Sequence, residues 1–173
     1  MDKTQNFVQY NLFQTHKNLL AFTTTKQTLE ESYPRFTGDH KSIFEKNRTQ
    51  LALQLGIKAE QFVFPRQTHT NCVAEISGIP EKAIDETDAL ITNQSGICLC
   101  VQTADCVPIL LFDPVKKVIG AVHAGWRGTV KKIVEATIQK MISNYNCSPE
   151  KIIAAIGPSI SPAVYEVGNE VGE

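Results

Sequence analysis

Two histidines and one cysteine stand at the ends of apolar segments, where their side chains could do chemistry. His69 follows the run FVF, Cys106 directly precedes the run VPILLF, and His123 closes the run VIGAV. Turns at strand ends let side chains converge without crowding the core. Imidazole and thiolate both suit zinc, and three protein ligands leave a fourth position for water or substrate. The three residues therefore predict a metal site of the catalytic type.

The same side chains also support chemistry without a metal. Cys106 would then be the nucleophile and His123 or His69 its base, with a third polar group to orient that base. The order of the residues fits both readings. Bound metal separates them, because a zinc-held thiolate is capped whereas a free catalytic thiolate is open to alkylation.

The remaining cysteines and histidines lack this context. Thr-Ala-Asp makes a polar corner just before Cys106. The other four cysteines are expected to be small packing side chains in apolar settings: Cys72, Cys98, Cys100 and Cys147. His16 and His40 are expected at the surface.

An anion site is predicted directly behind His123, where AGWRGTVKK leads into a helix. A helix start offers unpaired N–H groups, Gly125 and Gly128 permit close backbone approach, and Arg127 adds a fork of donors, so phosphate could dock there. The alternative is that the glycines shape a tight turn and Arg127 pairs with a local carboxylate. Trp126 is either a core residue or a ring for stacking a base.

The elements that must position these residues are mostly strands. A helix is expected over residues 40–55, with Asp39 as its cap and Gly56 as its stop. Short β-branched or apolar runs predict strands at 62–64, 72–76, 89–92, 97–101, 107–112, 118–122 and 152–156. Residues 80–86 read as a polar surface loop.

A second helix is expected after His123. Its apolar stripe comprises Val130, Ile133, Val134, Thr137, Ile138, Met141 and Ile142. Lys131, Lys132, Glu135 and Lys140 are left for solvent. Strands between helices, without a regular strand–helix alternation, favour an α+β fold, with a mixed β-sheet core flanked by helices, over a doubly wound one.

Length, composition and net charge limit the classes of function that the chain could have. The chain has 173 residues, 42% of them hydrophobic, which fits one domain spanning residues 1–173. Seventeen basic and 18 acidic residues leave a charge of -1 without a basic cluster, so a small-molecule ligand is expected and a nucleic acid is not. No secretory signal or membrane span is evident, and the five cysteines are an odd number, so a cytoplasmic protein with reduced thiols is expected.

Five ordered blocks give a resemblance to a known family. RQTHTNCV, TDALIT, VQTADCVPILLFD, IGAVHAGWRGT and AIGPSISPAVYEVGNEV resemble the signature blocks of the YfiH-like family, also called multicopper polyphenol oxidase or laccase-like, and purine nucleoside phosphorylase. The resemblance runs from Phe22 to the last residue. Relatives continue with further strands and helices, so the resemblance implies that the C-terminal part of the domain is missing here.

The resemblance implies an α+β fold related to cysteine-hydrolase-like domains and a zinc ion held by His69, Cys106 and His123. It also implies phosphorolysis of adenosine, inosine, guanosine and methylthioadenosine to the base and ribose 1-phosphate, and hydrolytic deamination of adenosine. Laccase-like oxidation of phenols with copper and hydrolytic editing of peptidoglycan precursors are attributed to relatives.

We therefore expect a zinc-dependent purine nucleoside enzyme of unknown oligomeric state that uses phosphate. Four histidines are few for a multicopper cluster. The residue acting as general acid is open, with Asp88 and Glu166 as candidates. Polyphenol oxidation, peptidoglycan-precursor hydrolysis and an inactive metal-binding module are the alternatives.

Overall fold

The centre of the chain is a mixed sheet of five strands in the order β4-β5-β8-β7-β9. The computed structural model describes residues 7–29, 34–37, 41–168 and 171. β4 runs parallel to β5, and the other neighbouring strands are antiparallel. The strands are β4 (Val73–Glu75), β5 (Ala89–Thr92), β7 (Val107–Asp113), β8 (Val118–Ala124) and β9 (Ile153–Ile156). The α+β fold with a mixed sheet is confirmed.

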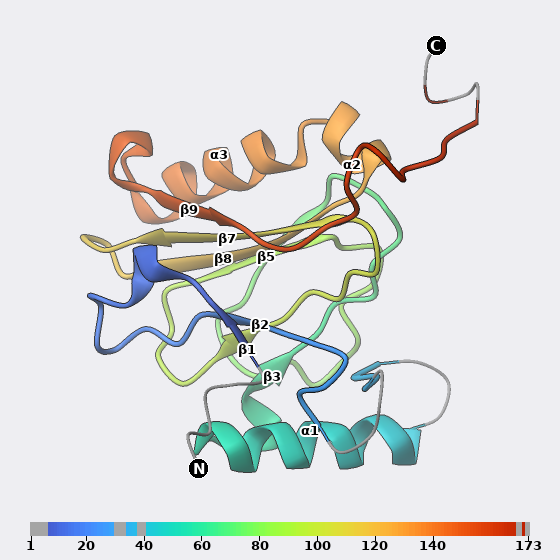
Figure 1. Ribbon diagram of the computed structural model, residues 1–173. Helices are drawn as coiled ribbons and strands as arrows, with labels where there is room; N and C mark the ends of the chain where they lie inside the picture. The colour runs from blue at the N-terminus through green and yellow to red at the C-terminus, as the bar shows by residue number, and fades with distance from the viewer. Residues whose placement is uncertain (1–6, 30–33, 38–40, 169–170, 172–173) are drawn as a thin grey trace.

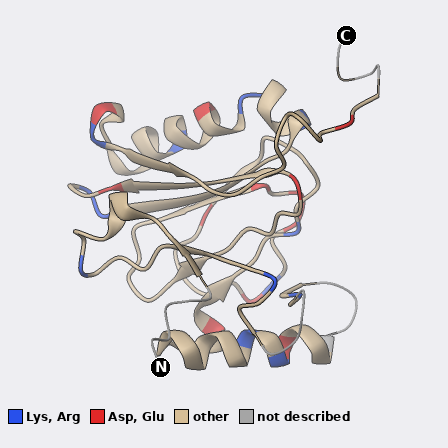
Figure 2. Cartoon of the chain, viewed as in Figure 1, with Lys and Arg blue, Asp and Glu red and all other residues tan. Residues whose placement is uncertain are grey.

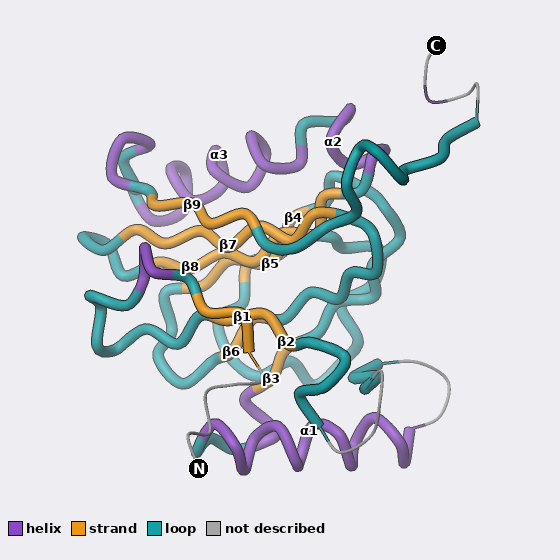
Figure 3. Tube along the Cα trace, viewed as in Figure 1, coloured by secondary structure: helices purple, strands orange, loops and turns teal. Residues whose placement is uncertain are grey.

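Helices and two small sheets cover this central sheet. Helix α3 (Ile133–Tyr145) lies over one face, and the small sheets with α1 (Lys41–Leu55) lie on the opposite side (Figure 1, Figure 3). β1 pairs antiparallel with β2, and β3 pairs parallel with β6. Their bounds and those of α2 are β1 (Phe7–Gln9), β2 (Phe22–Thr24), β3 (Phe62–Val63), β6 (Cys98–Leu99) and α2 (Trp126–Val130). Three 3-10 turns span Asn11–Phe13, Ala59–Gln61 and Pro149–Lys151.

The core follows the alternation of side chains along the strands. Ala89 and Ile91 of β5 pack in one cluster with Ile133 and Met141 of α3, all fully buried. Leu90 points to the opposite face and packs in a second cluster. Because successive strand residues face opposite sides, β5 is buried on both faces, which is typical of an interior strand.

Most expected elements are confirmed, with shifts of one or two residues at their ends. α1 matches the helix expected at 40–55, and each expected strand is present. The cap Asp39 and His40 lie outside the described residues. β1 and β2 were not expected, because each is three residues long and its segment shows no strand alternation.

The helix expected after His123 is two helices. α2 ends at Val130, Lys132 takes the left-handed conformation at φ 59, and α3 begins at Ile133. Val130 is therefore not on the buried stripe and is 75% exposed. Lys140, expected in solvent, is part-buried, and its ammonium donates to the Val73 carbonyl at 2.7 Å.

Charged side chains of both signs are spread over the described chain. Figure 2 shows basic and acidic positions side by side on α1 and around α3. Among the described residues no helix has the length and apolarity needed to cross a membrane.

Truncating Met141 of α3 and Val130 of α2 should test which of the two helices contributes to the apolar core. Met141 is fully buried, so Met141→Ala should lower the free energy of unfolding by about 2–5 kcal/mol. Val130→Ala, at an exposed position of α2, is the matched control and should change the free energy of unfolding by less than about 0.5 kcal/mol. Urea unfolding followed by circular dichroism measures both. Equal losses in the two variants would contradict the break between the helices.

Candidate metal centre

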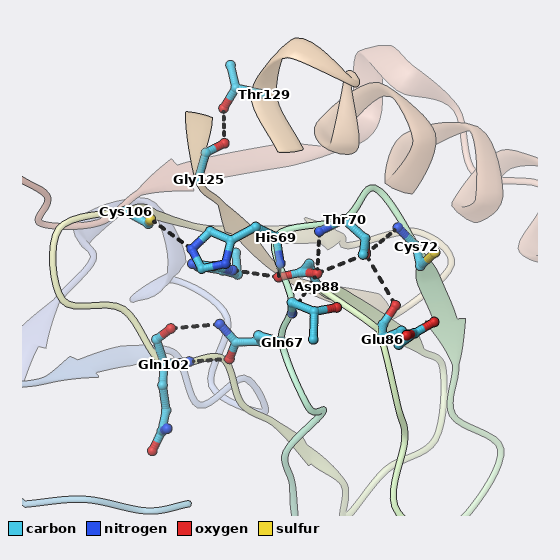
Figure 4. A network of polar contacts seen from close by, with 12 residues as sticks. Gln67, His69, Thr70, Cys72, Glu86, Asp88, Gln102, Cys106, Gly125 and Thr129 are labelled. Carbon is cyan, nitrogen blue, oxygen red and sulfur yellow. Dashed lines mark hydrogen bonds and ion pairs between the residues drawn. The ribbon is translucent and has the colours of Figure 1, made fainter. Parts of the chain in front are cut away.

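His69, Cys106 and His123 come together at one end of the central sheet. The ligand atoms of the three side chains all lie within 4.8 Å of one another. The Cys106 Sγ is 3.8 Å from the His69 Nε2, and the two imidazole rings are 4.8 Å apart between centroids. Figure 4 shows Cys106 facing His69. The structure thus gathers three residues that are far apart in the sequence.

Strand pairing explains how Cys106 reaches His123. β7 and β8 are antiparallel, with Pro108 opposite His123 and Val107 opposite Ala124. Cys106 directly precedes β7, so it lies level with the end of β8. The approach also needs Gly125, because a Cβ there would lie 2.7 Å from the His69 Cδ2 and 3.1 Å from the Cys106 Sγ.

His69 is positioned by the carboxylate of Asp88. The backbone N–H groups of Thr68, His69 and Thr70 donate to this carboxylate at 3.2, 3.1 and 2.7 Å, and the Thr70 hydroxyl donates at 2.8 Å (Figure 4). These bonds hold the loop in a tight turn around the anion, in which His69 takes a positive φ of 61. A non-glycine residue in this conformation is uncommon, and such strain is typical of functional sites.

Asp88 also fixes the ring of His123. The Nδ1 of His123 is 2.7 Å from Asp88 Oδ1, and both side chains are buried. Because the carboxylate accepts, Nδ1 carries the proton and Nε2 is left as the ligand atom. A histidine ligand backed by a carboxylate is the usual second layer of a zinc site. Sequence reasoning considered Asp88 only as a general acid, whereas its five contacts make it a positioning residue.

The pKa of Asp88 agrees with this role. Burial alone would raise the pKa of this carboxyl, but hydrogen bonds from His123, Thr70 and Thr68 outweigh burial and leave the pKa below its ordinary value. The group is therefore a carboxylate at neutral pH, and it acts as an acceptor. A general acid needs the opposite shift.

The pKa of Cys106 is raised, which disfavours the metal-free mechanism. Burial, with the negative charges of Asp105 and Asp88, raises the pKa of this thiol above its ordinary value. An activated cysteine nucleophile needs a lowered pKa. A bound cation would lower this pKa by binding the thiolate, and the negative charges of Asp105 and Asp88 would attract such a cation.

The residues present fit a zinc ion. Bonds of about 2.0–2.3 Å in a tetrahedron separate neighbouring ligand atoms by roughly 3.3–3.8 Å. The 3.8 Å between Cys106 Sγ and His69 Nε2 is close to one such edge, and all three ligand atoms lie within 4.8 Å of one another, so a bound ion would draw them slightly closer. One thiolate and two imidazoles would leave the fourth position open.

The two glycines behind His123 pack closely against neighbouring groups. Gly125 directly precedes α2 and lies against the three ligands, and a Cβ on Gly128 would lie 3.0 Å from the Thr70 carbonyl. Arg127 is exposed, and its guanidinium lies 4.1 Å from the centroid of the Trp126 ring. It forms no ion pair with any residue that the structure describes. The alternative considered for Arg127, pairing with a local carboxylate, is thus not seen among the described residues.

The other cysteines and histidines differ partly from expectation. All five cysteines are free, Cys147 is buried, and Cys98 and Cys100 are half-buried. Cys72 is exposed, so its expected role as a packing side chain is wrong. His16 is half-buried and its ring packs edge-on to Phe112 at 5.0 Å. Glu166 is exposed on the segment after β9.

A cavity of about 870 Å³ is lined by residues of the small sheets and of the segment that leads to Cys106. Thr103 and Ala104, just before the Asp105-Cys106 corner, contribute to its wall, and Phe36 and Phe64 supply aromatic surface. The three clustered ligands are not part of this wall. The cavity therefore meets this segment at Thr103 and Ala104, which precede the ligand Cys106 in the chain.

Adding a methyl group at Gly125 should test the closeness of the cluster. Gly125→Ala would press on His69 and Cys106, so we expect roughly 10- to 100-fold weaker zinc binding, the scale seen when support of a ligand is lost. Gly78→Ala, where a Cβ meets nothing within 4 Å, is the matched control. Competition with a zinc-binding dye measures both. Unchanged affinity in Gly125→Ala would show that the three side chains do not share one ion.

The fold and the cluster define a class: an α+β domain with one thiolate and two imidazoles at the end of a mixed sheet. The chain belongs to the family described as multi-copper polyphenol oxidoreductase laccase, whose model matches residues 27–173. This is the YfiH-like family. The structure of this chain resembles that of the Bacillus licheniformis hypothetical protein YfiH, with a TM-score of 0.79 and 32% sequence identity. The match covers 87% of this chain and 62% of that one.

Curated relatives of the chain bear the names of enzymes that act on purine nucleosides. The purine nucleoside phosphorylase of Bacteroides thetaiotaomicron is 38% identical over 186 residues, covering 99% of this chain and 69% of the relative. Adenosine deaminase RL5, from an unknown prokaryotic organism, is 40% identical over 146 residues, covering 80% of this chain and 55% of the relative. The chain thus spans only part of the length of the relatives it matches.

Proposed function

We propose that the chain is the zinc-binding portion of a phosphate-dependent purine nucleoside phosphorylase. The observation that carries the proposal is the convergence of His69, Cys106 and His123, with Asp88 behind them. The names of several relatives support the reaction class. The substrates we propose are adenosine, inosine, guanosine and methylthioadenosine.

Each residue has a defined task in this proposal. His69, Cys106 and His123 hold the ion, and Asp88 keeps the Nε2 of His123 free to bind it. When bound, zinc supplies a Lewis acid with one open coordination position. Arg127, exposed and without an ion-pair partner in the described part of the chain, is proposed to bind phosphate beside the glycines Gly125 and Gly128.

The reaction itself is a substitution at the sugar. An oxygen of hydrogen phosphate forms a bond to the anomeric carbon of the ribose, the bond from that carbon to the purine nitrogen breaks, and the proton that the phosphate loses is taken up by the leaving base. The products are the free base and ribose 1-phosphate. The chain's task is to hold the phosphate and the nucleoside in line, because positioning lowers the barrier of a two-substrate reaction.

Turnover of adenosine with and without phosphate tests the proposal. The zinc-loaded chain should release adenine and ribose 1-phosphate only when phosphate is present, as chromatography would show. Bound metal with no turnover would replace the proposal by an inactive metal-binding module. Oxidation of a phenol, or cleavage of a peptidoglycan precursor instead of adenosine, would replace it by the corresponding alternative.

Arg127→Ala should separate the phosphate reaction from other activity. Loss of a hydrogen bond to a charged group costs about 1.5–3 kcal/mol, so the KM for phosphate should rise roughly 10- to 100-fold. Arg66→Ala removes another exposed arginine, one paired with Asp85, and is the matched control. Steady-state kinetics with varied phosphate measures both. An equal effect of the two variants would rule out anion binding by Arg127.

Hydrolytic deamination of adenosine is the second candidate, since one relative bears that name. A metal-activated water serves this reaction directly. Inosine formed without phosphate would support it.

A further inference from the structure

Cys98 and Cys100 form a pair of thiols away from the metal centre. Their Sγ atoms are 4.0 Å apart, and the Cys100 thiol also donates to the Cys98 carbonyl at 3.4 Å. Cys98 belongs to β6, and the N–H of Cys100 extends the pairing by donating to the Val63 carbonyl at 2.9 Å. Residues two apart in an extended chain point to the same side, so the strand itself aims both thiols at one point.

The pair is lined by apolar surface and yet is accessible. Both cysteines pack beside the cluster that includes Phe36, Leu51 and Phe62. Both also contribute to the wall of the cavity of about 870 Å³. A small ion that enters the cavity could therefore approach the pair, and the neighbouring apolar cluster offers no side-chain oxygen to compete with the sulfurs.

One positive charge lies beside the pair. The hydrogen bond with Cys98 and burial raise the pKa of Cys100 well above its ordinary value, and the charge of Arg48 of α1 acts in the opposite direction by lowering it. Its guanidinium is held in place by a 2.8 Å bond from Nε to the Phe36 carbonyl and by the face of the Phe64 ring at 4.4 Å. The charge of Arg48 can offset the extra negative charge that two thiolates leave on a monovalent ion.

The sulfurs are in thiol–thiol contact, and their separation also admits an ion between them. A disulfide requires about 2.05 Å between sulfurs and Cα atoms within about 6.8 Å, whereas extended residues two apart lie at the far end of that range, near 6.6 Å. Two metal–sulfur bonds of about 2.3 Å span at most about 4.6 Å. The observed 4.0 Å lies close to this span.

We propose that Cys98 and Cys100 form a second metal site, selective for a soft monovalent cation of the Cu(I) class. Thiolates select soft ions, and a pair without further ligands suits low coordination numbers. Binding joins one Cu(I) to two sulfurs and releases two protons, one from each thiol, without oxidation or reduction. The site is separate from His69, Cys106 and His123.

Anaerobic titration with Cu(I) against a chromogenic Cu(I) chelator tests the proposal on the full chain. The background is Cys106→Ala, so that the first metal centre cannot contribute. This variant should bind one Cu(I) per chain. Adding Cys98→Ser or Cys100→Ser should weaken binding by more than the roughly 10- to 100-fold that loss of an outer partner costs. Adding Cys72→Ser, at an exposed thiol, should change nothing.

A second measurement needs no variant. Cu(I) should protect Cys98 and Cys100 of the unmodified chain from alkylation, as peptide mass spectrometry shows, while Cys72 stays reactive. Full Cu(I) binding in the Cys98→Ser and Cys100→Ser variants would overturn the proposal, as would equal alkylation of the pair with and without Cu(I). Neither result depends on nucleoside turnover, so the outcome is independent of the proposed function.

Discussion

Replacing Cys106 by alanine is expected to abolish zinc binding and nucleoside turnover together. The variant keeps both imidazoles but loses the thiolate, one of three protein ligands. The affinity for zinc should therefore fall by more than the roughly 100-fold upper range for second-layer changes. The fold should persist, because Cys106 lies at a half-buried corner before β7 and outside the core clusters.

The measurement combines metal analysis of the purified variant with the phosphate-dependent assay. Cys72→Ala is the matched control, because Cys72 is exposed and lies on the same loop as His69. Circular dichroism checks that both variants are folded. Zinc retained at one ion per chain by Cys106→Ala would disprove the ligand role. Zinc lost with turnover retained would separate the metal from the chemistry.

Replacing Asp88 by asparagine is expected to weaken both the fold and the metal centre. Asp88 is fully buried and accepts from three backbone N–H groups, the Thr70 hydroxyl and His123. Removing one partner of such a buried charged network costs about 3–5 kcal/mol. His123 also loses the acceptor that keeps its Nε2 free, so zinc affinity should fall roughly 10- to 100-fold.

Urea unfolding with a chelator present measures the first effect, and zinc titration measures the second. Asp85→Asn is the matched control: Asp85 is exposed and paired with exposed Arg66, so its loss should cost less than about 1 kcal/mol. Similar losses in the two variants would contradict the central place of Asp88.

The pH dependence of the free energy of unfolding gives a second test of the role of Asp88. Hydrogen bonds leave the folded pKa of Asp88 below its ordinary value of about 3.9. The carboxylate therefore stabilises the fold above that pH, and this contribution is lost as pH falls through the folded pKa. Asp88→Asn should flatten the loss of stability below about pH 4.

The sequence predicted the strands that carry the site because their pattern is local. β7 and β8 are continuous apolar runs, and Cys106 and His123 stand at their ends, so the meeting of these two residues follows from strand pairing. His69 is different. Its place depends on a turn formed around the carboxylate of a residue 19 positions away, and no local pattern reveals such a contact.

The misplaced helix start has a similar cause. Val130 fits the helical spacing of the apolar stripe, but the chain turns at Lys132, and α2 packs by Gly128 against the Thr70 carbonyl. The tertiary contact overrides the periodicity. Asp88 was recognisable as a charged residue preceding an apolar strand, and its network of acceptors became visible only in the structure.

X-ray absorption at the zinc edge shows which atoms bind the ion. We expect one zinc per chain with a single sulfur at about 2.3 Å and two imidazole nitrogens at about 2.0–2.1 Å. The sulfur signal should vanish in Cys106→Ala and persist in Cys72→Ala. A first shell without sulfur in the unmodified chain, or one whose sulfur survives the loss of Cys106, would contradict the account.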